Sequence, residues 1–173
     1  PQMDYSIIKA SMTDYESILH LYKKCTRHLE SIGIHQWDDT YPSPGMLRNN
    51  IRDGVTWVIR VQEVVIATVT LDSDQDEKFN AIHWAYPSDR VLVIHRLCVD
   101  PDHQGRGLAR YMIAFSEKYA EDHGYEVIRL DAFLGNTYSQ KLYRKLHYHE
   151  AIGYCYYPPD DIMCNCFEKK ICL

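Results

Sequence analysis

A short glycine-rich loop is the segment of this sequence whose residue types and spacing most clearly predict chemistry. An apolar, β-branched run begins at Val91 and reads V-L-V-I-H-R-L-C-V, which suits a strand buried on both faces. Proline stops the strand at Asp100-Pro101, and Gln104-Gly105-Arg106-Gly107 follows. Glycine backbone can approach an anion closely, and the free N–H groups at a helix start attract phosphate. The spacing therefore predicts an anion site just before a helix.

Two arginines could add positive charge to this site, since Arg106 lies in the loop and Arg110 one turn into the helix. The simplest alternative is a plain turn followed by a helix cap. A nucleotide-binding module is a second alternative, but the sequence lacks the G-K-[ST] of a P-loop. Its glycines also come too late in the chain for a dinucleotide fold.

Two motifs resemble the GNAT superfamily of acyl-CoA-dependent N-acetyltransferases. The glycine segment Gln104 to Ala109 matches the family's Q/R-x-x-G-x-G/A signature, and Leu97-x-Val99-x-Pro101 is similar to its fourth strand. Downstream, the family's later strand and helix are matched by Leu130-Asp131-Ala132, Asn136 and Leu142-Tyr143-Arg144-Lys145. The order of elements is also similar, so the resemblance covers essentially the whole chain.

The resemblance implies an α/β (α+β) fold in a single domain over residues 1–173. Its central sheet would be mixed and mostly antiparallel, with about seven strands and about four helices, and splayed between the fourth and fifth strands. One departure is His147-Tyr148, where many members carry Gly-Phe. We expect this difference to affect the turn into the closing strand more than the chemistry.

The resemblance also implies acetyl-CoA (coenzyme A) as cofactor. The backbone of Leu97, Cys98 and Val99 would hold the pantetheine arm and the thioester carbonyl. The pyrophosphate would lie on the glycine segment, at Gln104, Gly105, Arg106, Gly107, Leu108, Ala109 and Arg110. Asn136 would bond the pantetheine arm, although simple N-capping of a helix explains an asparagine there equally well.

Acyl transfer to an amine needs a polarised carbonyl, a neutral nucleophile and a proton for the departing thiolate. Tyr143 matches the family's proton donor, and its alternative is one more half-buried aromatic side chain. Asp131 and His95 are two candidates for the general base, and a water relay is a third. Cys98 as an acyl-enzyme nucleophile is disfavoured, because no activating base lies beside it in sequence.

Two aromatic segments are expected to flank the acceptor, a primary amine of a small molecule or peptide. They supply Trp37 and Tyr41 from one segment and His83 and Trp84 from the other. The alternative is that the tryptophans simply cover the core. A non-catalytic acyl-CoA sensor on the same fold is the alternative function.

Local patterns predict the elements that position these groups. Strands are expected at 5–9, 55–60, 64–71, 91–99, 126–132, 148–156 and 164–172, with a hairpin turn at Gln62-Glu63 and another at 158–160. Helices are expected after a capping box at Thr13–Glu16, after Ser43-Pro44, after Gly107 and after Asn136.

Composition narrows the class of protein. The 173 residues are 46% hydrophobic, which provides a real core, and the net charge of −5 argues against a general nucleic-acid binder. There is no apolar run of about 20 residues and no secretory signal pattern, so neither membrane insertion nor secretion is expected. The six scattered cysteines predict free thiols in the cytoplasm and no metal site, with Cys164-Asn165-Cys166 as ordinary strand packing. A homodimer is possible by analogy with the family.

Overall fold

The structure is a computed structural model that describes residues 4–158 and 162–171. Its strands are β1 (Ile7–Lys9), β2 (Thr56–Val61), β3 (Val64–Asp72), β4 (Val91–Val99), β5 (Val127–Phe133), β6 (His149–Tyr157) and β7 (Ile162–Lys170). Its helices are α1 (Tyr15–Ser31), α2 (Pro44–Arg52), α3 (Leu108–Asp122) and α4 (Thr137–Lys145), with short 3₁₀ helices η1 (Met12–Asp14), η2 (Glu77–Ala81) and η3 (Pro101–His103). Of the sequence expectations, the centre of the turn at 158–160 and Cys172 lie outside the described residues.

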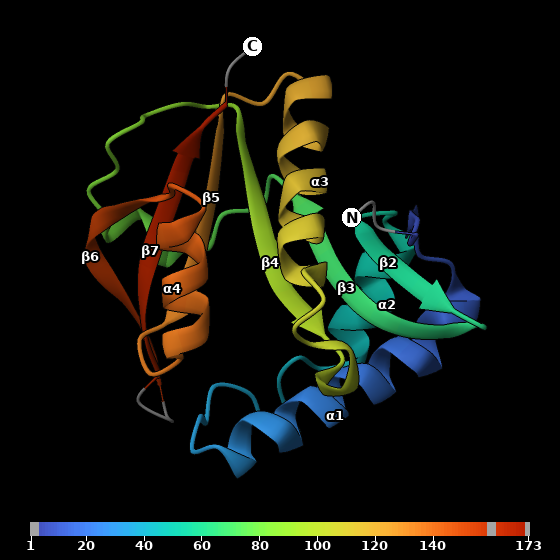
Figure 1. Ribbon diagram of the computed structural model, residues 1–173. Coiled ribbons are helices and arrows are strands. Elements are labelled where there is room, and N and C mark those ends of the chain that lie inside the picture. The colour runs from blue at the N-terminus through green and yellow to red at the C-terminus, as the bar shows by residue number, and fades with distance from the viewer. Residues whose placement is uncertain (1–3, 159–161, 172–173) are drawn as a thin grey trace. The chain divides into compact units, whose positions relative to one another are not determined.

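The strands form a seven-stranded sheet in the order β1-β2-β3-β4-β5-β7-β6 (Figure 1). The β4–β5 pair is parallel, whereas the β1–β2, β2–β3, β5–β7 and β6–β7 pairs are antiparallel. The mixed, mostly antiparallel α/β fold with four helices is thus confirmed. The register of β4 with β5 covers only Val91–Val93, and a pairing this short agrees with the expected splay.

The chain divides into two compact units. The first unit comprises residues 1–71 and 95–115, and the second comprises 72–94 and 116–173. Both β4 and α3 therefore contribute one part to each unit. That residues 1–173 act as a single domain stays a prediction. No helix in the described ranges is long and apolar enough to cross a bilayer.

In the first unit, α1 and α2 cover one face of the strands. Their apolar side chains share a core with Val58 of β2, Val65 of β3 and Cys98 of β4. Side chains alternate along a strand, so Trp57, the neighbour of Val58, faces the other way. Its ring lies 5.0 Å from Phe115 of α3. The opening turns of α3 thus cover the second face of this unit.

The capping box forms two residues earlier than expected, at Ser11–Asp14, and it opens η1 instead of α1. Helix α1 begins at Tyr15, and the 3₁₀ turn η1 precedes it. The Asp14 carboxylate accepts the Ser11 backbone N–H at 2.9 Å and pairs with Arg60 Nε at 2.9 Å. The prediction of Thr13 as the cap was therefore wrong, because Asp14 reaches back to Ser11.

Two further local predictions are confirmed. Ser43 caps α2 by accepting the Met46 N–H at 3.2 Å. The turn between β2 and β3 places both Gln62 and Glu63 at positive φ (51° and 68°). Two consecutive left-handed residues are the geometry of a tight hairpin turn that follows the twist of its strands.

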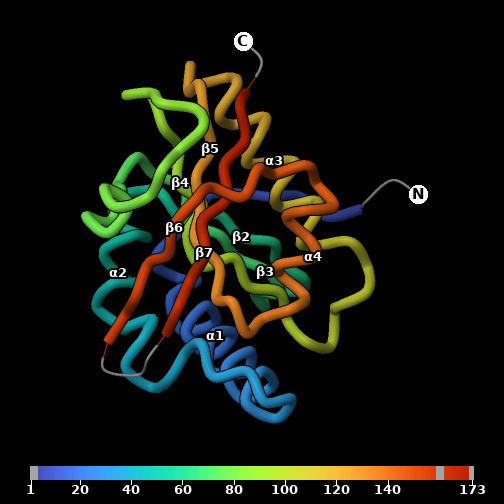
Figure 2. The backbone as a smooth tube through the Cα atoms, turned by 90° about the vertical axis from the view of Figure 1, so that its left-hand side faces the viewer, coloured from blue at the N-terminus to red at the C-terminus, as the bar shows by residue number. Residues whose placement is uncertain are grey.

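In the second unit, β5, β7 and β6 carry helix α4 on one face and the segment before β4 on the other. The ring of Tyr143 in α4 lies 5.6 Å from that of Phe167 in β7. Cys166, the neighbour of Phe167, faces a core that includes Phe79 and Ile82. Figure 2 shows this segment beside β6, where His83 and Ile152 pair as an isolated antiparallel bridge.

Candidate functional site

The glycine loop of the first unit is open and has the backbone conformation of an anion site. Gln104, Gly105, Arg106 and Gly107 are all exposed. The two glycines have φ of 79° and 78°, a left-handed conformation that other residues adopt only at a cost. A Cβ added at Gly105 would meet nothing within 4 Å. The space above this backbone is therefore free for a ligand.

Helix α3 begins directly after the loop, at Leu108, whose side chain is only 2% exposed. Burial of Leu108 fixes the start of the helix, where backbone N–H groups have no partner within the helix. A left-handed glycine loop leading into a fixed helix start suits the pyrophosphate of coenzyme A. The loop residues thus fit the cofactor that the sequence predicts.

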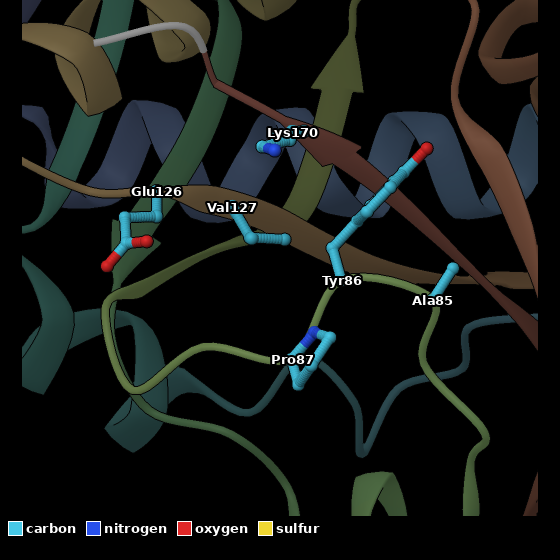
Figure 3. Close-up of a pocket in the computed structure, with 6 residues that line it drawn as sticks. All are labelled: Ala85, Tyr86, Pro87, Glu126, Val127 and Lys170. Atoms are coloured by element: carbon cyan, nitrogen blue, oxygen red, sulfur yellow. The ribbon is translucent and has the colours of Figure 1, made fainter.

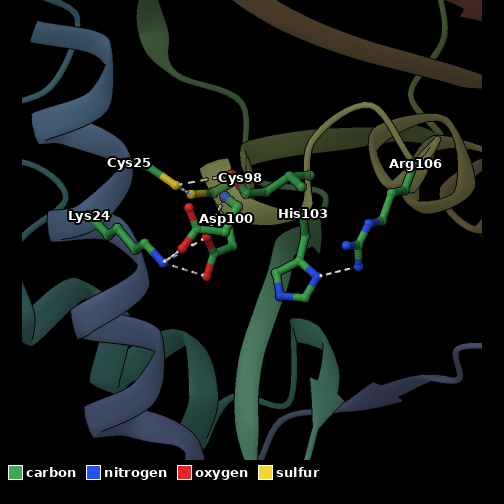
Figure 4. A network of polar contacts seen from close by, with 8 residues as sticks. Lys24, Cys25, Cys98, Asp100, His103 and Arg106 are labelled. Carbon is green, nitrogen blue, oxygen red and sulfur yellow. Dashed lines mark hydrogen bonds and ion pairs between the residues drawn. The ribbon is translucent and has the colours of Figure 1, made fainter. Parts of the chain in front are cut away.

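A charged network holds the segment that leads into the loop (Figure 4). Lys24 of α1 reaches Asp100 at 2.9 Å and Asp102 at 2.7 Å. The Asp100 side chain also accepts the Asp102 backbone N–H at 2.8 Å and so caps η3. Burial alone would raise the pKa of Asp100, but Lys24 and this amide lower it. The network ties α1 to the turn that precedes the glycines.

The two loop arginines differ in what they contact. A terminal nitrogen of Arg106 lies 3.1 Å from Nδ1 of His103, the last residue of η3 (Figure 4). Arg110 is exposed on the first turn of α3. Both side chains are therefore free of carboxylate partners among their described contacts, which agrees with their predicted use on phosphate.

The end of β4 is held by α1 through cysteine. Cys98 Sγ lies 2.6 Å from Cys25 Sγ, and the Cys25 thiol donates to the Val99 carbonyl oxygen at 3.3 Å. Both cysteines are free thiols and buried. Burial raises the pKa of Cys98 well above its ordinary value. A thiol so protonated is a poor nucleophile, which agrees with direct transfer to the amine.

The middle of β4 contains a strained residue that the sequence did not reveal. Arg96 has φ of 51°, and its carbonyl oxygen accepts the Tyr22 hydroxyl of α1 at 2.6 Å. A left-handed non-glycine residue costs about 1–2 kcal/mol, so its surroundings must hold it in place. It lies between His95 and Leu97, both half-buried and both predicted to act in the reaction.

In the second unit, Tyr143 is a buried phenol on α4, only 6% exposed. Its ring makes an edge contact with Tyr148 at 5.7 Å and packs on Phe167. Burial, and then the negative charge of nearby Asp131, raise the pKa of Tyr143 above its ordinary value. The hydroxyl therefore keeps its proton at neutral pH, as a proton donor must.

Asp131 lies within β5 and accepts a hydrogen bond from the Tyr157 hydroxyl at 2.6 Å. Burial, followed by the charge of Asp131 and this hydrogen bond, raises the pKa of Tyr157. One carboxylate oxygen of the candidate base is thus committed to a tyrosine that stays protonated. No local pattern indicates this pairing, because the two residues are 26 positions apart.

Asn136 caps α4, which is one of the two roles predicted for it. Its side chain accepts the Ser139 N–H at 3.1 Å. Behind it, the Gln140 amide nitrogen donates to Asn165 Oδ1 at 2.6 Å, and Asn165 Nδ2 donates to Glu150 at 2.8 Å. This network, buried at Gln140 and Asn165 and exposed at Glu150, joins α4 to β7 and β6. The role of Asn136 on the pantetheine arm stays a prediction.

The α4 helix ends at the point where the chain departs from the family motif. His147 has φ of 66°. Its N–H donates to the Arg144 carbonyl at 3.1 Å, and the Tyr148 N–H donates to the Tyr143 carbonyl at 3.0 Å. This is the Schellman end, in which glycine is the usual residue at the His147 position. His147 thus adopts the left-handed conformation that glycine adopts at little cost.

Two predicted acceptor residues lie in the first unit. Trp37 packs on its core with its ring 5.4 Å from that of Tyr22. Tyr41 is 42% exposed, and its hydroxyl accepts a long contact from Arg96 Nη1 at 3.4 Å. Trp37 therefore covers the core, whereas Tyr41 is available to a ligand.

The other two lie in the second unit, where His83 is exposed and Trp84 is tied down. The Trp84 indole donates to the Phe79 carbonyl at 3.0 Å, and the Arg129 guanidinium stacks over its ring at 4.2 Å. A hollow of about 240 Å³ opens beside this segment (Figure 3). It is lined by Ala85, Tyr86, Pro87, Glu126, Val127 and Lys170, none of which was a predicted site residue.

The structure thus groups the predicted residues by unit. The first holds the glycine segment, the end of β4, His95 and one aromatic pair. The second holds Tyr143, Asp131, Asn136 and the other pair. The residues that sequence reasoning missed are those that support them across long separations, notably Lys24, Tyr22, Arg96 and Tyr157.

Comparison with known proteins shows the family of the chain. Residues 15–148 match the sequence profile of the acetyltransferase (GNAT) family. No curated protein sequence matched the chain.

Solved structures of similar fold include a GNAT family acetyltransferase from Streptococcus agalactiae, with a TM-score of 0.81 and 23% identity over 96% of this chain and 95% of that one. PaiA N-acetyltransferase from Thermoplasma acidophilum, solved in complex with coenzyme A, has a TM-score of 0.71 and 16% identity over 97% of this chain and 99% of that one. The ribosomal-protein-S18-alanine N-acetyltransferase from Escherichia coli has a TM-score of 0.70 and 16% identity over 98% of this chain and 95% of that one. The family profile covers well over half of this chain, so the chain belongs to the GNAT family of acetyltransferases.

Proposed function

We propose that this protein is an N-acetyltransferase that moves an acetyl group from acetyl-CoA to a primary amine of a small molecule or peptide. Acetyltransferases of the GNAT family use acetyl-CoA, so family membership supports the donor. The observation that carries the proposal is the exposed pair Gly105 and Gly107, left-handed and placed directly before α3. No other exposed loop in the described ranges joins two left-handed glycines to a helix start.

The cofactor would be held mainly by backbone groups of the first unit. Amides from Gly107 to Ala109 and the side chains of Arg106 and Arg110 would bind its phosphates. Backbone of Leu97, Cys98 and Val99 would hold the pantetheine arm and the thioester carbonyl, and Asn136 would add one contact. When bound, acetyl-CoA supplies an activated acetyl thioester.

Tyr143 would supply its Oη proton to the departing sulfur. Its support in the structure is the raised pKa, caused by burial and by Asp131. Such a phenol carries its proton before the reaction begins. The transfer step then releases the coenzyme A thiolate, which is the base that accepts this proton. The geometry of α4 favours this role because the Schellman end fixes the turn that carries Tyr143.

Three routes remain for the proton of the attacking amine. Asp131 has one oxygen occupied by Tyr157, His95 is half-buried on β4, and a water relay needs neither. The dependence of kcat/KM on pH, measured for Asp131→Asn and His95→Gln, distinguishes them. Loss of the acid limb in one variant identifies that residue as the base, and an unchanged profile in both leaves the water relay.

A thiol-release screen tests the proposed function. The panel contains polyamines, aminoglycosides, amino acids and peptide N-termini, each with acetyl-CoA. We expect acetyl-CoA to raise the melting temperature and at least one amine class to release free coenzyme A. Stabilisation without release by any amine would contradict the proposal and would favour the non-catalytic acyl-CoA sensor.

Two further expectations accompany the proposal. A homodimer and a cytoplasmic location are inferred from family analogy and sequence composition. Light scattering at several concentrations measures the first, and localisation of a tagged full-length chain measures the second.

A further inference from the structure

The side chain of Arg96 is a cation without a described counter-ion, on the strand that is proposed to hold the acetyl carbonyl. Nη2 donates to Asn50 Oδ1 of α2 at 2.7 Å, and Nη1 makes the 3.4 Å contact with the Tyr41 hydroxyl. Nε is buried and has no hydrogen-bond partner. Its described partners are thus both neutral, and the guanidinium is incompletely satisfied.

Three other arginines pair with a carboxylate at a short distance: Arg60 with Asp14 at 2.9 Å, Arg90 with Glu126 at 2.8 Å and Arg144 with Glu150 at 3.0 Å. Arg129 also has a buried Nε without a hydrogen-bond partner, but its guanidinium stacks on the Trp84 ring at 4.2 Å. A charge that is partly removed from water is costly unless it is paired. Among its described contacts Arg96 has neither a carboxylate nor an aromatic ring over its guanidinium, and this points to a ligand as its counter-ion.

The guanidinium is also held in a defined place. The Arg96 backbone is fixed in its left-handed conformation by the Tyr22 hydroxyl, and Asn50 anchors one end of the side chain. The Nη1 end lies at the exposed side, against Tyr41. A cation that is anchored at one end and open at the other is prepared to bind an anion.

The position favours the acceptor as the source of that anion. Tyr41 belongs to the segment expected to flank the acceptor, and Leu97, the next residue along β4, is proposed to face the thioester. The loop residues Gly105, Gly107 and Arg106 are already proposed to bind the phosphates of the cofactor. A carboxylate on the amine substrate would therefore complete the Arg96 site.

We propose that Arg96 binds the carboxylate of the acceptor, so that the substrate class is an amino acid or another amine that carries a carboxylate. The assignment rests on the proposed N-acetyltransferase function. Arg96 would determine specificity, because it binds the substrate away from the reacting nitrogen. The exposed Tyr41 hydroxyl would take the second carboxylate oxygen.

The test compares the free acid and the primary amide of the same amino acids, for example L-phenylalanine, L-lysine and L-glutamine. The amide keeps the size of the substrate and removes its charge. The ratio of kcat/KM for acid over amide is measured in the wild type and in Arg96→Met. Differences in amine pKa between the two substrates cancel when the ratios of the two proteins are compared.

We expect the ratio to fall about 10- to 100-fold in Arg96→Met, the range for losing a charge-assisted hydrogen bond. Arg96→Lys should retain part of it. Asn50→Asp provides a second test that does not remove the arginine, since the new carboxylate would neutralise the guanidinium from within. This variant should also lower the ratio, while its melting temperature should hold or rise.

An unchanged ratio in both Arg96→Met and Asn50→Asp would overturn the assignment and leave the proposed function intact. A tenfold loss of acetyl-CoA affinity in Arg96→Met with an unchanged ratio would also overturn it, because the guanidinium would then serve a cofactor phosphate. Absence of thiol release with every acid and amide in a wild type that also fails the wider amine screen would overturn the proposed function and this assignment together.

Discussion

The two units present their proposed functional groups in opposite ways. In the first, the groups are backbone amides at the start of α3, reached through the exposed, left-handed glycines Gly105 and Gly107. In the second, the group is one hydroxyl on Tyr143, buried and kept protonated. A backbone site depends on local conformation and tolerates many side chains, whereas a buried hydroxyl depends on a single atom. Binding and chemistry should therefore respond to different substitutions.

The largest effect is expected at Tyr143. Tyr143→Phe should lower kcat by about 100-fold or more, because a general acid typically contributes that much or more. Tyr148→Phe is the matched control, since Tyr148 is a neighbouring buried tyrosine whose hydroxyl has no hydrogen-bond partner. Its turnover and stability should not fall. Equal losses of kcat in the two variants would remove the special role of Tyr143.

The next comparison distinguishes a role of Gly105 in cofactor binding from the stability cost of replacing any left-handed glycine. Gly105 and Gly124 both have positive φ (79° and 76°), and a Cβ at either position would meet nothing within 4 Å. Alanine at either position should cost about 1 kcal/mol of stability. Only Gly105→Ala should also weaken acetyl-CoA binding, by about tenfold, as measured by calorimetric titration. Equal affinities in the two variants would contradict the placement of the phosphates.

A smaller effect is expected from the support of the loop. Lys24→Met should weaken acetyl-CoA binding a few-fold without changing kcat, whereas Lys23→Met, an exposed neighbour on α1, should change neither. A fall in kcat with unchanged affinity would show that Lys24 does not act through the loop.

The effect of Lys24→Met on the free energy of unfolding is predicted to depend on pH. Asp100 has its pKa lowered from 3.8, so its stabilisation is present above that value and is lost as pH falls through the lowered one. Lys24 has its pKa raised from 10.5, first by Asp102 and then by Asp100, so its contribution is lost only as pH rises through the raised value. The stability difference between wild type and Lys24→Met should thus be largest between the two ordinary pKa values, 3.8 and 10.5, as measured by denaturant unfolding.

The smallest effect concerns the end of α4. His147→Gly should increase stability by about 0.5–1 kcal/mol, because glycine adopts the left-handed conformation at little cost. His147→Ala removes the imidazole and keeps the strain, so it should give no such gain. Denaturant unfolding measures both, and an equal gain in the two would assign the effect to the imidazole instead.

What could be predicted from the sequence was determined by neighbouring residues. The Ser43 cap, the Gln62-Glu63 turn, the Asn136 cap and the glycine loop each depend on residues a few positions apart, and all have the expected conformation. The capping box at Thr13 was wrong although it is local, because the Asp14 carboxylate faces Ser11 and a distant arginine, Arg60. Local pattern could not show that competition.

The supports of the candidate site could not be predicted, because their partners lie far apart in the chain. Lys24 and Asp100 are 76 positions apart, and Tyr22 and Arg96 are 74 apart. Nothing in the run V-L-V-I-H-R-L indicates that Arg96 leaves the strand conformation. The Tyr22 hydroxyl reaches the Arg96 carbonyl because of the tertiary fold, which local propensity does not show.

The glycine loop is proposed to bind the cofactor, whereas Tyr143 is proposed to act only in the transfer step. The most direct measurement is the acetyl-CoA dissociation constant of Gly105→Ala and of Tyr143→Phe, titrated side by side with the wild type. We predict about tenfold weaker binding for Gly105→Ala and an unchanged constant for Tyr143→Phe. Tyr143→Phe binding as weakly as Gly105→Ala would contradict the account.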